Sequence, residues 1–177
     1  MEKIIVYTAL FTDNIEEIFG TLPEYDIDNI DFVCFTNTPY LKSKTWDIRL
    51  VDIKGNGRLT ARKYKMLPNI YLPTYDGWIW MDNSCLFRYD PIDLYNYYMD
   101  DYDICLHEHC DRINIQQEAD ILISRGHDAE IISKQIKGYY SEGYEDQGLY
   151  ETGILMRRNN SKVIEFNEQW WQEINTK

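Results

Sequence analysis

The sequence predicts an α/β fold built on a mainly parallel sheet, and three observations predict it. Short apolar runs alternate with helical patterns through the first half of the chain. The first run, residues 3–10, is continuously apolar, which is typical of a strand covered on both faces. The chain has 177 residues and is 44% hydrophobic, so we expect one folded domain over residues 1–177.

The predicted strands are short runs rich in apolar, β-branched and aromatic residues. They cover residues 3–10, 31–37, 46–52, 77–81, 102–106 and 152–157, and residues 85–87 continue the fourth strand in extended form. The predicted helices cover residues 60–69, 91–99, 113–124, 129–137 and 160–174. Asp90 and Pro91 fit the cap and first turn of the second helix. Residues 55–57 and 138–145 are glycine-rich and predict loops.

The net charge of −12 argues against a nucleic-acid partner, because phosphate affinity needs a surface of Lys and Arg. A nucleotide is not excluded, since a metal ion or a local basic pocket can offset its charge. No apolar run approaches the roughly 18–20 residues that cross a bilayer, and residues 1–7 do not resemble a signal peptide. We therefore expect no transmembrane segment and a cytoplasmic protein, of a bacterial or virus-infected cell.

Four scattered cysteines are present: Cys34, Cys85, Cys105 and Cys110. Buried free thiols in a reducing compartment are the simplest interpretation. The last two cysteines, with His107 and His109, offer zinc ligands as an alternative, but their spacing matches no common zinc motif.

Polar residues follow several predicted strands at the edge where ligands of parallel sheets bind, namely Thr8, Thr36, Asn37 and Asp82. Asp82 comes directly after a buried strand, so it could supply a hard oxygen ligand to a metal–diphosphate site. A turn or capping carboxylate is the simpler alternative. Arg62 and Lys65 lie three residues apart on one helical face. They could neutralise a diphosphate, pair with the strand-end acid Asp82, or form a solvated helix surface.

Two later segments also carry candidate side chains. His109 and Arg112 follow a predicted strand and could meet an anionic group, or the histidine could be hydrogen bonded in a surface loop. Asp146, Gln147 and Glu151 precede the last strand, where such side chains can hold hydroxyl groups or act as a base on an alcohol. A polar loop without function is the alternative. The chain has neither a Gly-x-Ser-x-Gly motif nor a glycine-rich phosphate loop.

Several of these motifs occur in one order along nearly the whole chain. They are residues 6–11, 32–37, 61–68 and 80–83, then His109 with Arg112, Glu118 with Ala119, residues 148–152 and residues 166–173. This ordered set resembles a glycosyltransferase-like domain family that includes plant mucilage-associated proteins and many bacterial and viral ones. The stretches Leu-x-Glu-Thr and Asn-Glu-x-Trp-Trp-x-Glu are its most specific part.

The resemblance implies a GT-A fold, an α/β/α sandwich that binds an activated sugar and Mn²⁺ or Mg²⁺. The implied activity is hexosyl transfer from a nucleoside-diphosphate sugar, UDP-sugars being favoured, to a glycan or another hydroxyl acceptor. Tyr7, Thr8 and Ala9 would line the nucleotide pocket together with Thr36 at the end of the next strand.

The same resemblance implies roles for the charged residues. Arg62 and Lys65 would face the diphosphate, and Asp82, with Asn83 or Ser84, would stand where the family's metal motif stands. Four further positions match family positions that we assign to the donor sugar or acceptor: His109, Arg112, Glu118 and Glu151.

Residues 146–149 are similar to the Asp-Gln-x-Leu stretch of retaining family-eight glycosyltransferases. That stretch serves the reacting sugar, which assigns such a role to Asp146 and Gln147.

The chain departs from the family pattern at two places. The family usually has Asp-Gly-Asn where residues 82–84 are Asp-Asn-Ser, and its pattern continues into a basic segment beyond position 177. Two alternatives follow for the C-terminus: the sequence is truncated there, or the protein is naturally short and lacks part of its acceptor site. Both departures favour one alternative, a nucleotide-sugar or glycan-binding domain without turnover. A metal-dependent lipid amide hydrolase using Asp82, His107 and His109 is a second alternative, and an interaction protein is a third.

Overall fold

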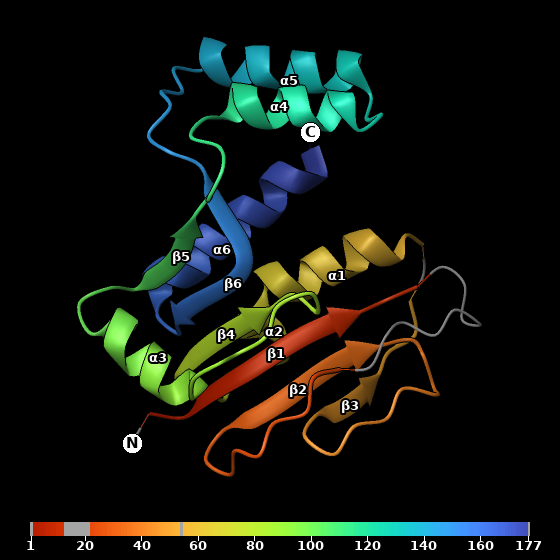
Figure 1. Ribbon diagram of the computed structural model, residues 1–177, viewed down its shortest axis with the longest axis vertical. Helices are drawn as coiled ribbons and strands as arrows, with labels where there is room; N and C mark the ends of the chain where they lie inside the picture. Colours follow the sequence, from red (N-terminus) through yellow and green to blue (C-terminus); the bar gives the residue numbers. More distant parts are fainter. Residues whose placement is uncertain (1, 13–21, 54, 177) are drawn as a thin grey trace. The chain divides into compact units, whose positions relative to one another are not determined.

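The computed structural model describes residues 2–12, 22–53 and 55–176 (Figure 1). The contacts divide the chain into two compact units. One unit comprises Met1–Cys105 and Gly153–Thr176, and the other comprises Leu106–Thr152. Among the helices of the described ranges, none is long and apolar enough to cross a membrane.

A six-stranded sheet in the order β3-β2-β1-β4-β6-β5 forms the framework (Figure 1). β1 pairs in parallel with β2 and with β4, β2 pairs in parallel with β3, and β6 is antiparallel to β4. The predicted α/β class with a mainly parallel sheet is therefore confirmed. The strands are β1 (Ile4–Leu10), β2 (Asp31–Thr36), β3 (Asp47–Leu50), β4 (Gly77–Met81), β5 (Ile104–Glu108) and β6 (Tyr150–Arg158).

Helices fill most of the remaining chain, close to the predicted positions. They are α1 (Gly57–Met66), α2 (Pro68–Tyr71), α3 (Pro91–Met99), α4 (Ile115–Ser124), α5 (Ala129–Ser141) and α6 (Ser161–Thr176). Asp90 caps α3, as predicted, because its side chain accepts a hydrogen bond from the backbone N–H of Ile92.

The helix predicted over residues 60–69 is two helices, and it begins earlier. Asn56 caps α1 by accepting from the backbone N–H of Leu59 at 2.9 Å, so the helix starts at Gly57 rather than at Thr60. Pro68, which has no N–H to donate, begins the separate α2. Asn56 lies between two glycines, a pattern that predicts a loop, so the sequence placed the start of this helix too late.

Two further predictions need correction. α5 continues to Ser141, so the loop predicted over residues 138–145 is wrong for its first four residues. Gly138 is tolerated inside this helix, whose apolar spacing continues from Ile132 and Ile136 to Tyr139. Residues 85–87 lie outside the strands, and Cys110 is exposed rather than buried.

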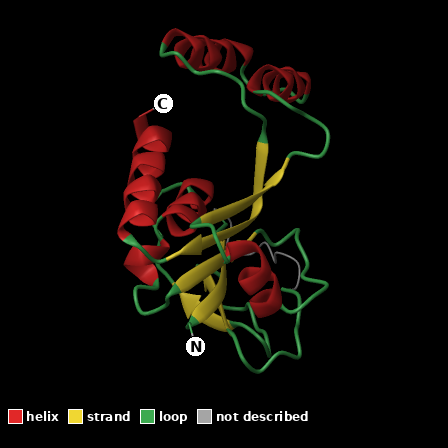
Figure 2. Cartoon of the chain, turned by 90° about the vertical axis from the view of Figure 1, so that its left-hand side faces the viewer, coloured by secondary structure: helices red, strands yellow, loops and turns green. Residues whose placement is uncertain are grey.

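In the first unit apolar side chains are buried on both faces of the sheet. Helices lie on either side of the sheet (Figure 2). One face carries Val6, Ile79 and Met81, which pack with Tyr95 and Met99 of α3. On this face Gly77 begins β4 directly against Tyr95, since an added Cβ would lie 2.2 Å from the tyrosine hydroxyl oxygen. The absence of a side chain at this position lets α3 approach the sheet.

The opposite face is organised around Arg157 of β6, whose side chain is completely buried. Its guanidinium donates to the backbone carbonyls of Lys65 (2.5 Å) and Met66 (3.4 Å), the last residues of α1. It also donates to the Tyr7 hydroxyl of β1 and to Asn167 Oδ1 of α6, both at 2.5 Å. One side chain therefore joins two strands and two helices.

We expect Gly77→Ala to destabilise the protein by about 1–3 kcal/mol, because the added methyl group would overlap the buried Tyr95 ring. Urea unfolding would measure this loss. Gly138→Ala is the control: no atom lies within 4 Å of its added Cβ, and Ala favours the helix by about 1 kcal/mol over Gly. Equal stability of Gly77→Ala and the parent would contradict the packing described here.

We expect Arg157→Met to cost about 3 kcal/mol, because several buried acceptors would lose their donor while the side-chain volume changes little. Chemical denaturation of the variant measures the loss. Lys162→Met, on an exposed position of α6, should stay within about 0.5 kcal/mol of the parent. An equal effect of the two substitutions would refute the proposed importance of Arg157.

Candidate functional site

The candidate site lies where the strand order of the sheet reverses. The chain runs outward from β1 to β2 and β3, and then crosses to β4 on the other side of β1. Ligands of open α/β sheets bind outside the carboxyl ends of the strands at such a reversal. Asp82 is the first residue after β4, so it lies at this edge of the sheet, as predicted.

Asp82 forms a closed group with Lys65 and Trp80. Its Oδ1 accepts from Trp80 Nε1 at 2.6 Å and from Lys65 Nζ at 3.2 Å. Lys65 Nζ also lies 5.2 Å from the centroid of the Trp80 ring, a cation–π contact. The Lys65 side chain is 11% exposed and that of Asp82 is 41% exposed. The carboxylate thus reaches solvent while the ammonium group is largely enclosed.

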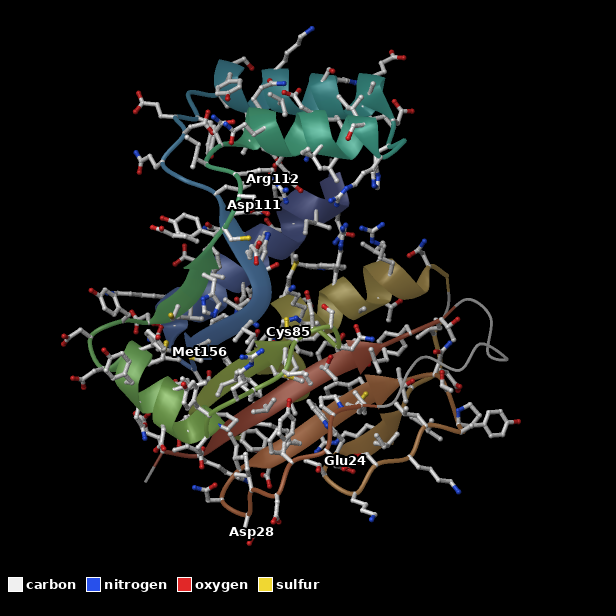
Figure 3. All side chains as sticks on the ribbon, in the orientation of Figure 1. Glu24, Asp28, Cys85, Asp111, Arg112 and Met156 are labelled. Atoms are coloured by element: carbon white, nitrogen blue, oxygen red, sulfur yellow. The ribbon has the colours of Figure 1, made fainter. Side chains whose placement is uncertain are left out.

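The backbone around Asp82 is fixed on both sides. Its N–H donates to the carbonyl of Gly153 on β6 at 2.7 Å, and its carbonyl accepts from the N–H of Cys85 at 2.9 Å. Cys85 is labelled in Figure 3. These bonds hold the turn that follows β4. Asn83 and Ser84, the other predicted metal ligands, are exposed in that turn.

Lys65 reaches Asp82 because of how α1 ends. The Lys65 carbonyl accepts from Arg157 and from the Tyr7 hydroxyl, the latter at 2.8 Å, so its backbone is anchored over β1. Arg58, Arg62 and Lys65 are spaced four and three residues apart, which places them on one face of the helix. Of these, Arg58 and Arg62 are exposed, whereas Lys65 turns inward.

The group carries an excess of positive charge. Burial lowers the pKa of Lys65, and the nearby Arg157 and Arg62 lower it further, while Asp82 opposes them. Burial, and then the neighbouring Arg58, lower the pKa of Arg62. Asp82 forms an ion pair with Lys65. Such a surface favours binding of an anion.

The residues predicted to line a nucleotide pocket are enclosed in the sheet. Tyr7, Thr8, Ala9 and Thr36 are all buried, and the Thr36 hydroxyl accepts from the backbone N–H of Thr38 at 3.0 Å. Tyr7 uses its hydroxyl on both Arg157 and the Lys65 carbonyl. We therefore correct the expected role of Tyr7, whose side chain has no exposed surface to offer a ligand.

The second unit holds the other predicted residues. In this unit β5 leads to the segment containing Asp111 and Arg112, both labelled in Figure 3. The backbone N–H groups of these two residues donate to His109 Nδ1 at 3.1 and 3.2 Å. His109 Nε2 lies 3.5 Å from Glu151 Oε1 and contacts Arg112 Nη2. Arg112 also forms an ion pair with Glu118. The structure thus brings these four predicted residues together.

Asp146 has a structural role in the same unit, and Gln147 is exposed. Asp146 Oδ1 accepts from the N–H of Ile115, the first residue of α4, at 3.1 Å. Its Oδ2 accepts from the Tyr140 hydroxyl of α5 at 2.6 Å. Both oxygens therefore hold the pair of helices α4 and α5, which pack on each other (Figure 1).

Neither carboxylate cluster fits the expected Mn²⁺ or Mg²⁺. At Asp82 a lysine ammonium and an indole N–H already use Oδ1, and the ammonium charge would repel a divalent cation bound to this carboxylate. His109, Cys110 and Glu151 place possible ligand atoms within 4.8 Å of one another, a set that suits zinc better than magnesium.

That second cluster is also a poor metal site in its present arrangement. His109 Nδ1 accepts two backbone hydrogen bonds, so in the neutral ring the proton belongs on Nε2, whereas a metal-bound histidine usually donates through its other nitrogen. The Arg112 guanidinium beside Nε2 would repel a cation. Hydrogen bonding to Asp111 raises the pKa of the Cys110 thiol, which disfavours the thiolate that a metal needs.

Sequence reasoning missed Arg157, Asn167 and the indole of Trp80. The signal for Arg157 is an arginine that directly follows the apolar run Ile-Leu-Met of a strand. A charge in such a position needs a buried partner, and the sequence alone does not show that the partners are the carbonyls at the end of α1.

We expect the free energy of unfolding to fall as the pH rises from about 10 to about 12, partly because of Tyr7. Burial raises the pKa of Tyr7 to about 12. As the pH rises, the hydroxyl therefore ionises in the unfolded chain before it ionises in the folded one, and this ionisation stabilises the unfolded state. Below pH 10 this contribution is constant. Two pKa units correspond to roughly 3 kcal/mol at most.

Unfolding of Tyr7→Phe across this pH range should show a shallower slope than the parent. Tyr40→Phe, at an exposed position, should keep the parent's slope. Identical slopes for Tyr7→Phe and the parent would contradict the assignment.

Comparison with known proteins found no relative of this chain. No family model matches the chain. No curated protein sequence matches it, and no solved structure matches it. The function is therefore inferred from the geometry and chemistry of the chain itself.

Proposed function

We propose that this chain is a glycosyltransferase that takes its sugar from a nucleoside-diphosphate donor and transfers it to a hydroxyl acceptor. One observation carries the proposal: Lys65, on the basic face of α1, meets Asp82 at the carboxyl end of β4, where the strand order reverses. The GT-A arrangement and the preference for a UDP-sugar come from the family resemblance and belong to the same proposal.

The chemistry of sugar transfer suits such a cationic edge. The bond between the anomeric carbon and the phosphate oxygen breaks, and the leaving nucleoside diphosphate gains negative charge. Cations held in place before the reaction stabilise this charge without reorganising. Lys65 is held by Asp82 and Trp80, and the exposed guanidinium of Arg62 can bind two phosphate oxygens at once.

The proposal gives Asp82 a positioning role. Through its Oδ1 it orients the Lys65 ammonium at the edge of the sheet, and Trp80 fixes that carboxylate in turn. Glu151, which is exposed and close to His109, is the proposed residue that orients the sugar or accepts the acceptor's proton. Gln147 keeps its predicted role with the sugar within this proposal.

A donor-binding domain without turnover is the second candidate, and one observation favours it. Both carboxylate oxygens of Asp146 are used to hold α4 and α5, so this predicted catalytic residue is engaged in structure. Such a domain would bind the nucleotide through the same cations and release no product.

Nucleotide binding and product formation test the proposal. Isothermal titration with UDP, GDP, ADP, CDP and dTDP should find at least one that binds, and the matching sugar nucleotide should yield free nucleoside diphosphate. Arg62→Ala should weaken binding at least about tenfold, since a hydrogen bond to a charged group contributes about 1.5–3 kcal/mol. Lys63→Ala, exposed on another face of α1, should bind as the parent does.

The outcomes separate the two candidates. Binding with no product from any sugar nucleotide would support the binding domain, and binding of none of the five diphosphates would overturn both.

A further inference from the structure

We propose that the chain binds the diphosphate of its donor without a divalent cation, because the Lys65 ammonium group already lies against the Asp82 carboxylate and would repel a metal ion there. This inference rests on the proposed function and deepens it. The expected Mn²⁺ or Mg²⁺ would be replaced by a protein cation that is part of the fold.

One oxygen of the Asp82 carboxylate is already occupied. Asp82 Oδ1 accepts from two nitrogen donors, Lys65 Nζ at 3.2 Å and Trp80 Nε1 at 2.6 Å. A magnesium-type ion coordinates oxygen at about 2.1 Å. An ion at that distance from Oδ1 would lie within about 5 Å of the Lys65 ammonium group, and the two positive charges would repel each other.

The position of the Lys65 side chain is fixed by its surroundings. Its side chain is 11% exposed and lies over the Trp80 ring. Its carbonyl is bound by Arg157 and Tyr7, so the backbone from which the side chain extends is anchored in the core. Moving the ammonium away to admit a metal would leave a charged group without its carboxylate in a largely enclosed place.

The charges at this edge also differ from those of a metal site. A metal-dependent diphosphate site usually has one or two carboxylates, and the ion bridges them to the phosphates. Here the Asp82 carboxylate is shared with a lysine, and Ser84 offers only a neutral, exposed hydroxyl. The cations Arg58, Arg62 and Lys65 lie on one face of α1 and can offset the two or more negative charges of a diphosphate directly.

Titration calorimetry on the full chain tests this inference, with the five nucleoside diphosphates as probes. Each is titrated once in EDTA and once in excess Mn²⁺. For any diphosphate that binds, we expect dissociation constants in the two buffers to agree within about threefold. Affinity that vanishes in EDTA and returns with Mn²⁺ would overturn the metal-free inference and leave the proposed sugar transfer standing. Absence of binding in both buffers would overturn both proposals.

Two variants test whether Lys65 is responsible for diphosphate binding without a metal. Lys65→Met keeps the length of the side chain and removes its charge, so we expect affinity in EDTA to fall at least tenfold, a loss of about 1.4 kcal/mol. Lys63→Met is the matched control on the exposed face of α1 and should keep the parent's affinity. Equal binding by Lys65→Met and the parent would overturn the role of Lys65.

Asp82→Asn gives a second, independent readout that does not depend on the folding of Lys65→Met. The amide has the shape of the carboxylate but not its charge, so Lys65 would be held less firmly at this edge. We therefore expect Asp82→Asn to lower the affinity by the same factor in EDTA and in excess Mn²⁺. A metal-dependent site would lose its ligand, so a loss of affinity that is confined to the Mn²⁺ buffer would contradict the inference.

Discussion

The first unit depends on a guanidinium group that is buried without a carboxylate partner among the residues that the structure describes. Arg157 donates to the carbonyls of Lys65 and Met66, to the Tyr7 hydroxyl and to Asn167. The last carbonyls of a helix have no partners within the helix and carry the negative end of its dipole. The Arg157 guanidinium donates to these carbonyls and places a positive charge at the negative end of the α1 dipole. It also fixes the helix against β1, β6 and α6.

This arrangement leaves positive charge near the edge of the sheet where β4 ends. Carbonyl dipoles and a hydroxyl solvate a guanidinium but do not neutralise it, and burial lowers the pKa of Arg157 as a result. Lys65 extends from the same anchored end of α1, and Arg58 and Arg62 continue the charge along the helix. The same constraint that stabilises the core therefore prepares the edge of β4 for an anion. Asp82 meets a cation of the protein there, and its indole neighbour Trp80 keeps the pair in register.

In the second unit, side chains with catalytic chemistry are largely used to hold the backbone. Asp146 connects the start of α4 with α5, and His109 accepts two backbone N–H groups of the segment after β5. Carboxylates and imidazoles are suited to both tasks, since the atoms that accept a proton from a substrate also accept hydrogen bonds from amides. Glu151 differs, because its carboxylate is exposed beside His109.

The sequence by itself determined the α/β class, five of the helices nearly in place, the buried strand before Asp82 and the basic spacing of α1. Hydrophobic periodicity and capping residues report such features, because both act over a few neighbouring residues. The cap at Asn56 was missed because glycines surround it, and a local pattern cannot weigh a single side-chain bond against them.

Only the tertiary structure decided what Tyr7, Lys65 and Arg157 do. Their contacts with one another join positions that lie 58 to 150 residues apart in the chain, and no local rule specifies them. Tyr7 was predicted to line a ligand pocket and is buried between Arg157 and Lys65. For Lys65 the sequence left three roles open, and the tertiary structure shows the pairing with Asp82. Whether a charge faces water, a ligand or another charge depends on which carbonyls and carboxylates the fold brings within hydrogen-bonding distance, and that is a property of the packed chain.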